Sequence, residues 1–95
     1  MNIVIFGENT KRSIEKALSI LEEIPREQIK EVRKTSFSIV ATFINGDTLR
    51  TATANESSRG IRFEEVYIDS LIKQDIIDFI IFPHCNTNCK IHFFL

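Results

Sequence analysis

Two stretches decide the fold of this chain: Asn45–Arg50, which reads NGDTLR, and Glu65–Asp69, which reads EVYID. Asn-Gly-Asp between two runs of alternating apolar residues is typical of a tight β-turn, so the first stretch predicts a hairpin. In the second stretch Val66 and Ile68 alternate with a tyrosine, as in a strand with one buried face. This strand ends on a carboxylate, Asp69, which makes its end a candidate site.

The hairpin extends over Ser36–Ala54, where apolar residues alternate on both sides of the turn: Phe37, Ile39, Ala41, Phe43 and Leu49. A two-residue loop would place Phe43 opposite Thr48, whereas a three-residue loop places it opposite Leu49. Only the second register keeps the apolar residues on a common face. We therefore predict a three-residue loop at Asn45-Gly46-Asp47.

The first third of the chain predicts a strand followed by a helix. Asn2–Phe6 is a short apolar run, typical of a strand buried on both faces. Asn9 or Thr10 can cap a helix whose apolar stripe is Ile14, Ala17, Leu18, Leu21 and Ile24, and Pro25 ends the pattern. The segment 25–34 is charged and only weakly periodic, so we predict a connector in which Ile29 and Val32 can pack one helical turn.

The last third predicts a helix and a strand. Ile72, Ile76, Phe79 and Ile80 share one helical stripe between Leu71 and Phe82, Ser70 can cap this helix, and Pro83 ends it. A loop over His84–Asn88 then leads to a terminal strand over Lys90–Leu95, with Ile91 and Phe93 on one face. The predicted order is β-α-β-β-β-α-β. The fold class is therefore α/β, with a small, mostly parallel sheet and an antiparallel hairpin toward one edge.

Composition limits the architecture and the location of the protein. The 95 residues form a single domain, 1–95, since this length supports one compact core. The net charge of −1 creates no global field that would attract nucleic acid or an anionic membrane. Met1–Phe6 lacks the basic start of a signal peptide, no apolar run is long enough to span a bilayer, and two cysteines make no disulfide framework. We therefore expect no membrane association, reduced thiols and a cytoplasmic location.

These motifs together resemble part of a known family. Phe43–Arg50, then Ser58–Arg62 (SRGIR), then Val66–Asp69 are similar to the hairpin, Arg-Gly loop and Walker B strand of the bacteriophage terminase large subunit ATPase domain. The segment from Ile76 to Phe94 resembles the next helix and core strand of that family. The resemblance covers most of this chain but only the middle of such an ATPase domain. It implies a phage-encoded protein in the host cytoplasm, related to DNA packaging.

By the same resemblance, Asp69 occupies the position of the magnesium-linked aspartate, and Ser70 replaces the glutamate that activates water. The family's phosphate loop would precede Met1, and no G-x-x-x-x-G-K-[ST] motif occurs in the 95 residues. We therefore expect no enzyme activity and no cofactor, and we interpret Asp69 and Ser70 as a vestigial Walker B-like pair. The alternative for Asp69, which we favour, is an ordinary solvated or helix-capping carboxylate.

Two further sets of residues are candidate sites. Arg59 and Arg62 flank Gly60 in a polar loop and could bind a phosphate or a partner's carboxylate, or simply be solvated beside neighbouring glutamates. Cys85, Cys89 and His92 carry zinc-binding groups, but their spacing is not that of a common zinc loop. The alternative, which we favour, is that the cysteines pack in the fold and bind no metal.

The sequence therefore predicts a non-catalytic, phage-encoded binding or regulatory protein on a terminase-like scaffold. Its partner would be a host or phage protein, with nucleic acid as a second candidate. One alternative is a fragment or accessory of a DNA-packaging ATPase, which would need a phosphate loop from another chain. A further alternative is a structural homo-oligomer that pairs through the hairpin edge or the apolar end Ile91–Leu95.

Overall fold

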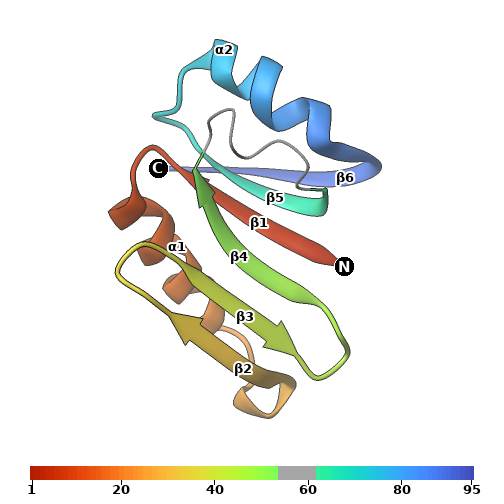
Figure 1. Ribbon diagram of the computed structural model, residues 1–95. Coiled ribbons are helices and arrows are strands. Elements are labelled where there is room, and N and C mark those ends of the chain that lie inside the picture. The colour runs from red at the N-terminus through yellow and green to blue at the C-terminus, as the bar shows by residue number, and fades with distance from the viewer. Residues whose placement is uncertain (54–61) are drawn as a thin grey trace.

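The computed structural model describes residues 1–53 and 62–95, apart from the side chains of residues 53, 86 and 87. These residues form a small α/β fold around one six-stranded sheet (Figure 1). In chain order the elements are β1 (Asn2–Gly7), α1 (Thr10–Glu22), the 3-10 turn η1 (Arg26–Gln28), β2 (Ile29–Lys34), β3 (Ile39–Phe43), β4 (Thr48–Thr53), β5 (Phe63–Asp69), α2 (Gln74–Ile76), the π-helical η3 (Ile77–Ile81), the 3-10 turn η4 (Phe82–His84) and β6 (Cys85–Phe94).

The sheet is mixed, with the strand order β2-β3-β4-β1-β5-β6. The strands β4, β1, β5 and β6 run parallel to one another, whereas β2, β3 and β4 pair antiparallel. The predicted α/β class is confirmed, but the antiparallel part of the sheet is larger than we predicted, so the sheet is mixed and not mostly parallel. The reason is that the hairpin gains a third antiparallel strand, β2.

Strand β1 lies inside the sheet and feeds two hydrophobic cores, because its side chains alternate between the two faces. On one face Ile5 packs with residues of α1, β3 and β4: Ala17, Leu21, Ile39, Ala41, Phe43 and Leu49. On the other face Val4 and Phe6 pack with β5 and the α2–η3 helix: Phe63, Val66, Ile68, Ile72, Ile77 and Ile81. The two helical segments therefore cover opposite faces, α1 on the β2–β4 half and α2 beside β5 and β6 (Figure 1).

Helix α1 begins where the sequence predicts. Asn9 is its N-cap, and the side-chain oxygen of Asn9 accepts a hydrogen bond from the backbone N–H of Arg12 at 2.9 Å. The buried stripe of α1 includes Ala17 and Leu21, as the periodicity indicates. No helix among the described residues is long and apolar enough to cross a membrane.

The segment 25–34 contradicts our prediction of a connector with a helical turn. Only Arg26–Gln28 is helical, and Ile29–Lys34 is the edge strand β2, antiparallel to β3. Five of the six side chains of β2 are exposed, and each of its two faces carries one apolar and two charged residues. The alternation that identifies a half-buried strand is therefore absent from this part of the sequence.

The hairpin has the predicted loop length but a different register. Ala41, and not Phe43, lies opposite Leu49. The loop is Ile44-Asn45-Gly46, closed by a hydrogen bond from the Phe43 N–H to the Asp47 carbonyl at 2.9 Å, and Gly46 takes a positive φ of 94°. Because the register differs by two residues, the apolar side chains still share one face.

The predicted helix over Leu71–Phe82 is present but starts later and is wound differently. It runs from Gln74 as α2, η3 and η4, and Lys73, not Ser70, occupies its N-cap position. The π-helical turn at Ile77–Ile81 inserts an extra residue and shifts the buried stripe. Ile77 and Ile81 are therefore buried, whereas Phe79, which we assigned to the core, is 78% exposed.

Strand β6 is longer than predicted, since it begins at Cys85 and includes most of the predicted loop His84–Asn88. Its pairing with β5 is irregular at the start. Phe63 lies opposite Cys85, and Glu65 lies opposite Lys90. From Lys90 onward the two strands pair in regular parallel register to Phe94.

We predict that Gly7→Ala destabilises the protein by about 2–3 kcal/mol. A Cβ atom at Gly7 would lie 2.5 Å from the backbone nitrogen of Ser13 and 2.8 Å from the carbonyl oxygen of Asn9, so the start of α1 would have to move. Urea unfolding measures this cost. The matched control is Gly46→Ala, where a Cβ has open space and only the positive φ opposes it, at about 1 kcal/mol. Equal losses in the two variants would contradict the close approach at Gly7.

Candidate functional site

The candidate site lies where the carboxyl ends of β1 and β5 meet. These two strands are parallel neighbours, and the helices that follow them lie on opposite faces of the sheet. In open α/β sheets the crevice at such a switch point is the usual place for a ligand. Gly7 ends β1 and Asp69 ends β5, as the sequence predicts for Asp69. Both residues therefore lie at the carboxyl ends of these strands.

Asp69 is fully buried and bound on both oxygens. Its Oδ2 accepts hydrogen bonds from Arg12 Nε at 2.5 Å and from the Glu8 backbone N–H at 2.9 Å. Its Oδ1 accepts from Arg12 Nη2 at 3.0 Å and from the Leu71 backbone N–H at 3.0 Å. A carboxylate has about four acceptor positions, and here four donors take them, so none is left for a metal ion.

The electrostatics of Asp69 follow from this arrangement. Burial raises the pKa of Asp69, but the Arg12 guanidinium and the two backbone N–H groups outweigh burial, and the net pKa lies below its ordinary value. The same hydrogen bonds raise the pKa of Arg12. Asp69 is therefore an ionised structural carboxylate, and the solvated or helix-capping alternative does not describe it.

Arg12 is the partner that sequence reasoning missed. It lies in the first turn of α1, where the helix dipole disfavours a cation and where no acidic residue is present. The side chain folds back to form a bidentate pair with Asp69, 57 residues away in the chain. A basic residue at an unfavourable helix terminus is the one sequence signal that could have indicated a nearby buried acid.

Ser70 takes part in the sheet through its backbone. Its N–H donates to the Phe94 carbonyl at 2.8 Å, and its side chain is exposed in the turn after β5. In the part of the chain that the structure describes, no group of three or more histidine, cysteine or acidic side chains is arranged to hold a metal ion.

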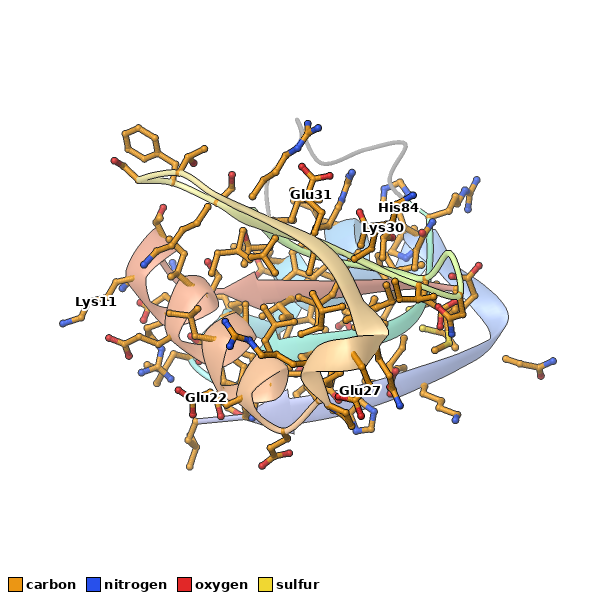
Figure 2. All side chains as sticks on the ribbon, turned by 90° about the horizontal axis from the view of Figure 1, so that it is seen from below. Lys11, Glu22, Glu27, Lys30, Glu31 and His84 are labelled. Carbon is orange, nitrogen blue, oxygen red and sulfur yellow. The ribbon has the colours of Figure 1, made fainter. Side chains whose placement is uncertain are left out.

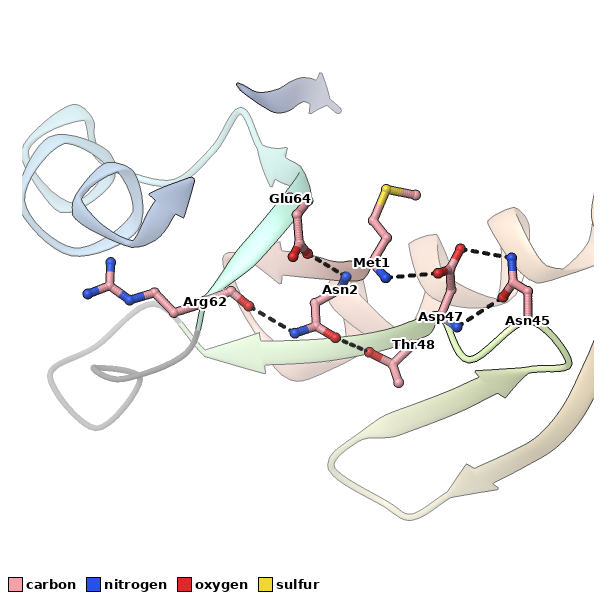
Figure 3. A network of polar contacts seen from close by, with 7 residues as sticks. All are labelled: Met1, Asn2, Asn45, Asp47, Thr48, Arg62 and Glu64. Carbon is pink, nitrogen blue, oxygen red and sulfur yellow. Dashed lines mark hydrogen bonds and ion pairs between the residues drawn. The ribbon is translucent and has the colours of Figure 1, made fainter. Parts of the chain in front are cut away.

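Of the two predicted arginines, Arg62 belongs to the described residues. Arg59 lies outside the described residues. Arg62 is exposed, and its Nη1 donates to the Pro83 carbonyl at 3.4 Å. The backbone carbonyl of Arg62 accepts from the Asn2 side chain at 3.3 Å, within a polar network at the amino ends of β1, β4 and β5 (Figure 3). Arg62 therefore lies at the amino end of β5, whereas Asp69 lies at its carboxyl end.

The candidate zinc ligands do not converge. Cys85 and Cys89 pack against the core on the α2 face of the sheet. His92 lies beside Tyr67, which packs on the α1 face, and the two rings stack with centroids 4.5 Å apart. His92 Nε2 also contacts Glu65 Oε2 at 2.8 Å. The three residues are close in sequence but lie on opposite faces of the sheet.

One cavity of the described residues lies away from the Asp69 site. It measures about 530 Å³ and lies beside the hairpin tip; its lining includes Ile3, Ile24, Phe43, Ile44, Glu27 and Asp47. A smaller cavity of about 250 Å³ lies near Arg12 and Phe94. Asp69 does not line either of these cavities, and its four acceptor positions are occupied. Binding is therefore better explained by the exposed surface.

That surface includes the two edges of the sheet. Strand β2 is charged along its length, with Lys30 and Glu31 on this edge (Figure 2) and Arg33 paired to Glu31 at 2.7 Å. Strand β6 forms the other edge and exposes Ile91 at 43% and Phe93 at 55%. The two edges therefore differ in chemistry.

We predict that Asp69→Ala lowers the free energy of unfolding by about 3 kcal/mol, because it leaves Arg12 and two buried N–H groups without an acceptor. Chemical denaturation measures the loss. The control is Glu15→Ala, since Glu15 is exposed and meets Lys11 only at 3.9 Å; this change should leave the midpoint unchanged. A similar loss in both variants would show that Asp69 has no special structural part.

We also predict an acid-dependent stability carried by Asp69. Its pKa is lower in the folded than in the unfolded protein, so its stabilisation is complete above about pH 4 and is lost as the pH falls through the lowered pKa. The difference in unfolding free energy between the native protein and Asp69→Asn should therefore shrink on acidification. Urea titrations at a series of pH values test this. A difference that stays constant down to about pH 2 would contradict it.

Comparison of the chain with protein-family models, curated proteins and solved structures finds no match. The resemblance to the terminase ATPase domain therefore depends on the short motifs alone, and the comparisons assign the chain to no family.

Proposed function

We propose that this protein is a non-catalytic binding module that pairs the open edge of β6 with an extended segment of a partner protein. The observation that carries the proposal is the position of β6. Among the described residues, this ten-residue strand is the last in the sheet and pairs only with β5. Its other side presents backbone groups that a further strand could bind.

The backbone orientation of β6 identifies which residues face the open side. The Phe94 carbonyl accepts from Ser70, so Phe94 turns its backbone groups toward β5. Backbone groups alternate in direction along a strand. Ile91 and Phe93 therefore direct their N–H and C=O groups to the open edge.

The side chains of β6 favour pairing at this edge. Between Cys85 and Leu95 there is no acidic residue and no proline, and Ile91 and Phe93 add exposed apolar surface. Edge strands that avoid pairing carry charges, as β2 does with four charged residues among six. The contrast between the edges supports β6 as the binding side.

The chemistry of the edge also describes the segment that would bind. An added strand places its side chains beside Ile91 and Phe93 on one face, so apolar residues at alternate positions would complement them. Lys90 is exposed and lies beside Glu65, which contacts His92. A partner segment with an acidic residue near Lys90 would therefore fit best.

The state of Asp69 supports the non-catalytic part of the proposal. An aspartate whose four acceptor positions are taken cannot bind magnesium or receive a proton without losing the ion pair that it shares with Arg12. The phage setting, a part in DNA packaging and contact with nucleic acid stay predictions of the motifs. Pairing of β6 with a second copy of the chain is the alternative that the experiment below distinguishes.

The test selects a random peptide library on the folded protein and measures binding of the selected peptides by fluorescence anisotropy. We expect peptides with alternating apolar residues, bound at least about tenfold more weakly by Phe93→Pro, which blocks a backbone donor at the open edge. Phe93→Lys, which adds a charge without a backbone constraint, should also weaken binding. Circular dichroism verifies that each variant folds.

The matched control is Val32→Pro at the other edge. Thr35 donates to the Ser38 carbonyl, and the alternation along β2 then turns the backbone of Val32 outward, as at Phe93. Val32→Pro should bind the peptides as the native protein does. Equal weakening by both proline variants would contradict the proposal, and a concentration-dependent dimer that Phe93→Pro dissociates would replace the partner segment with a second copy.

A further inference from the structure

Cys85 and Cys89 flank the irregular start of β6. While β5 advances two residues, from Phe63 to Glu65, β6 advances five, from Cys85 to Lys90. Two residues of a strand span roughly 6.6 Å, whereas five span roughly 16 Å. Three extra residues of β6 are therefore accommodated as a bulge between Cys85 and Lys90, and this bulge shortens the straight path between the two cysteines.

The two thiols also share one environment. Both cysteines are unpaired, half-buried and packed against the hydrophobic core on the α2 face. Burial first, and then the neighbouring Cys89 side chain, raise the pKa of Cys85 to about 12. The two thiols therefore lie on the same face of the sheet, on either side of the irregular segment.

We propose that Cys85 and Cys89 form a dithiol site that a small-molecule disulfide, such as oxidised glutathione, converts to an intramolecular disulfide. This inference does not depend on the proposed binding at the β6 edge. It rests on the shortened path between the two cysteines and on their common burial.

The reaction proceeds in two exchange steps. The Cys89 thiolate attacks one sulfur of the small disulfide, which breaks its S–S bond, releases one thiolate and leaves a mixed disulfide on Cys89. Cys85 then loses its proton and attacks the Cys89 sulfur, which forms the Cys85–Cys89 bond and releases the second thiol. Two electrons pass from the protein dithiol to the small disulfide, which becomes two thiols.

The order of attack follows from the environment of Cys85. Its raised pKa keeps it a thiol at neutral pH, and only a thiolate is an effective nucleophile. Cys89 is therefore the residue that reacts first with the incoming disulfide. The product disulfide would hold the start of β6 in one conformation, because it joins Cys85, which lies opposite Phe63, to Cys89, which precedes Lys90.

The test incubates the native chain with oxidised glutathione, alkylates free thiols and measures the intact mass and its peptides. We expect a loss of two hydrogen atoms, no alkylation and one peptide pair linked through Cys85 and Cys89. Cys85→Ser should stop at a single glutathione on Cys89. Cys89→Ser should react about tenfold more slowly, because Cys85 is then the sole nucleophile.

The native chain alone decides the outcome, so a variant that fails to fold does not weaken the test. Two glutathiones on one molecule would show that the thiols cannot reach each other. Disulfide-linked dimers on a non-reducing gel, or alkylation of both thiols after the incubation, would likewise overturn the proposal.

Discussion

One buried carboxylate connects the two halves of this fold. Asp69 ends β5, and its oxygens accept from the turn after β1, from α1 and from the turn that leads to α2. A buried charge is stable only when it is paired and hydrogen-bonded, so these three segments have to meet at one point. The direction of α1, the end of β5 and the path toward α2 are therefore coupled, although the two helical segments pack on opposite faces of the sheet.

This coupling explains why the site was predicted only in part. The sequence pattern identified β1, the Asn9 cap of α1, the turn at Gly46 and the strand that ends at Asp69, because each produces a local signal within a few residues. The partner of Asp69 is 57 residues away, and no local pattern shows that Arg12 folds back from the first turn of α1. The same limit applies to β2, whose exposed faces produce no alternation, and to the π turn, where one extra residue moved the buried stripe from Phe79 to Ile77 and Ile81.

Proximity in sequence was equally misleading for the cysteines and His92. Residues of a strand whose numbers differ by an odd value point to opposite faces of the sheet. Cys89 and His92 therefore cannot bind the same metal ion. In our proposal the irregular start of β6 has the reverse effect, since its extra residues let Cys85 and Cys89 approach each other where a regular strand would hold them apart. Whether sulfur chemistry occurs here is thus decided by strand geometry and not by the number of suitable residues in the segment.

The unequal edges of the sheet limit how this protein can assemble. Strand β2 is charged on its exposed side, and β6 is apolar and uncharged over most of its length. A strand added at β6 therefore has no equivalent acceptor at the far side of the same molecule. Such a sheet can terminate a row of strands but cannot continue one, so edge pairing would yield complexes of fixed size and would not propagate into fibres.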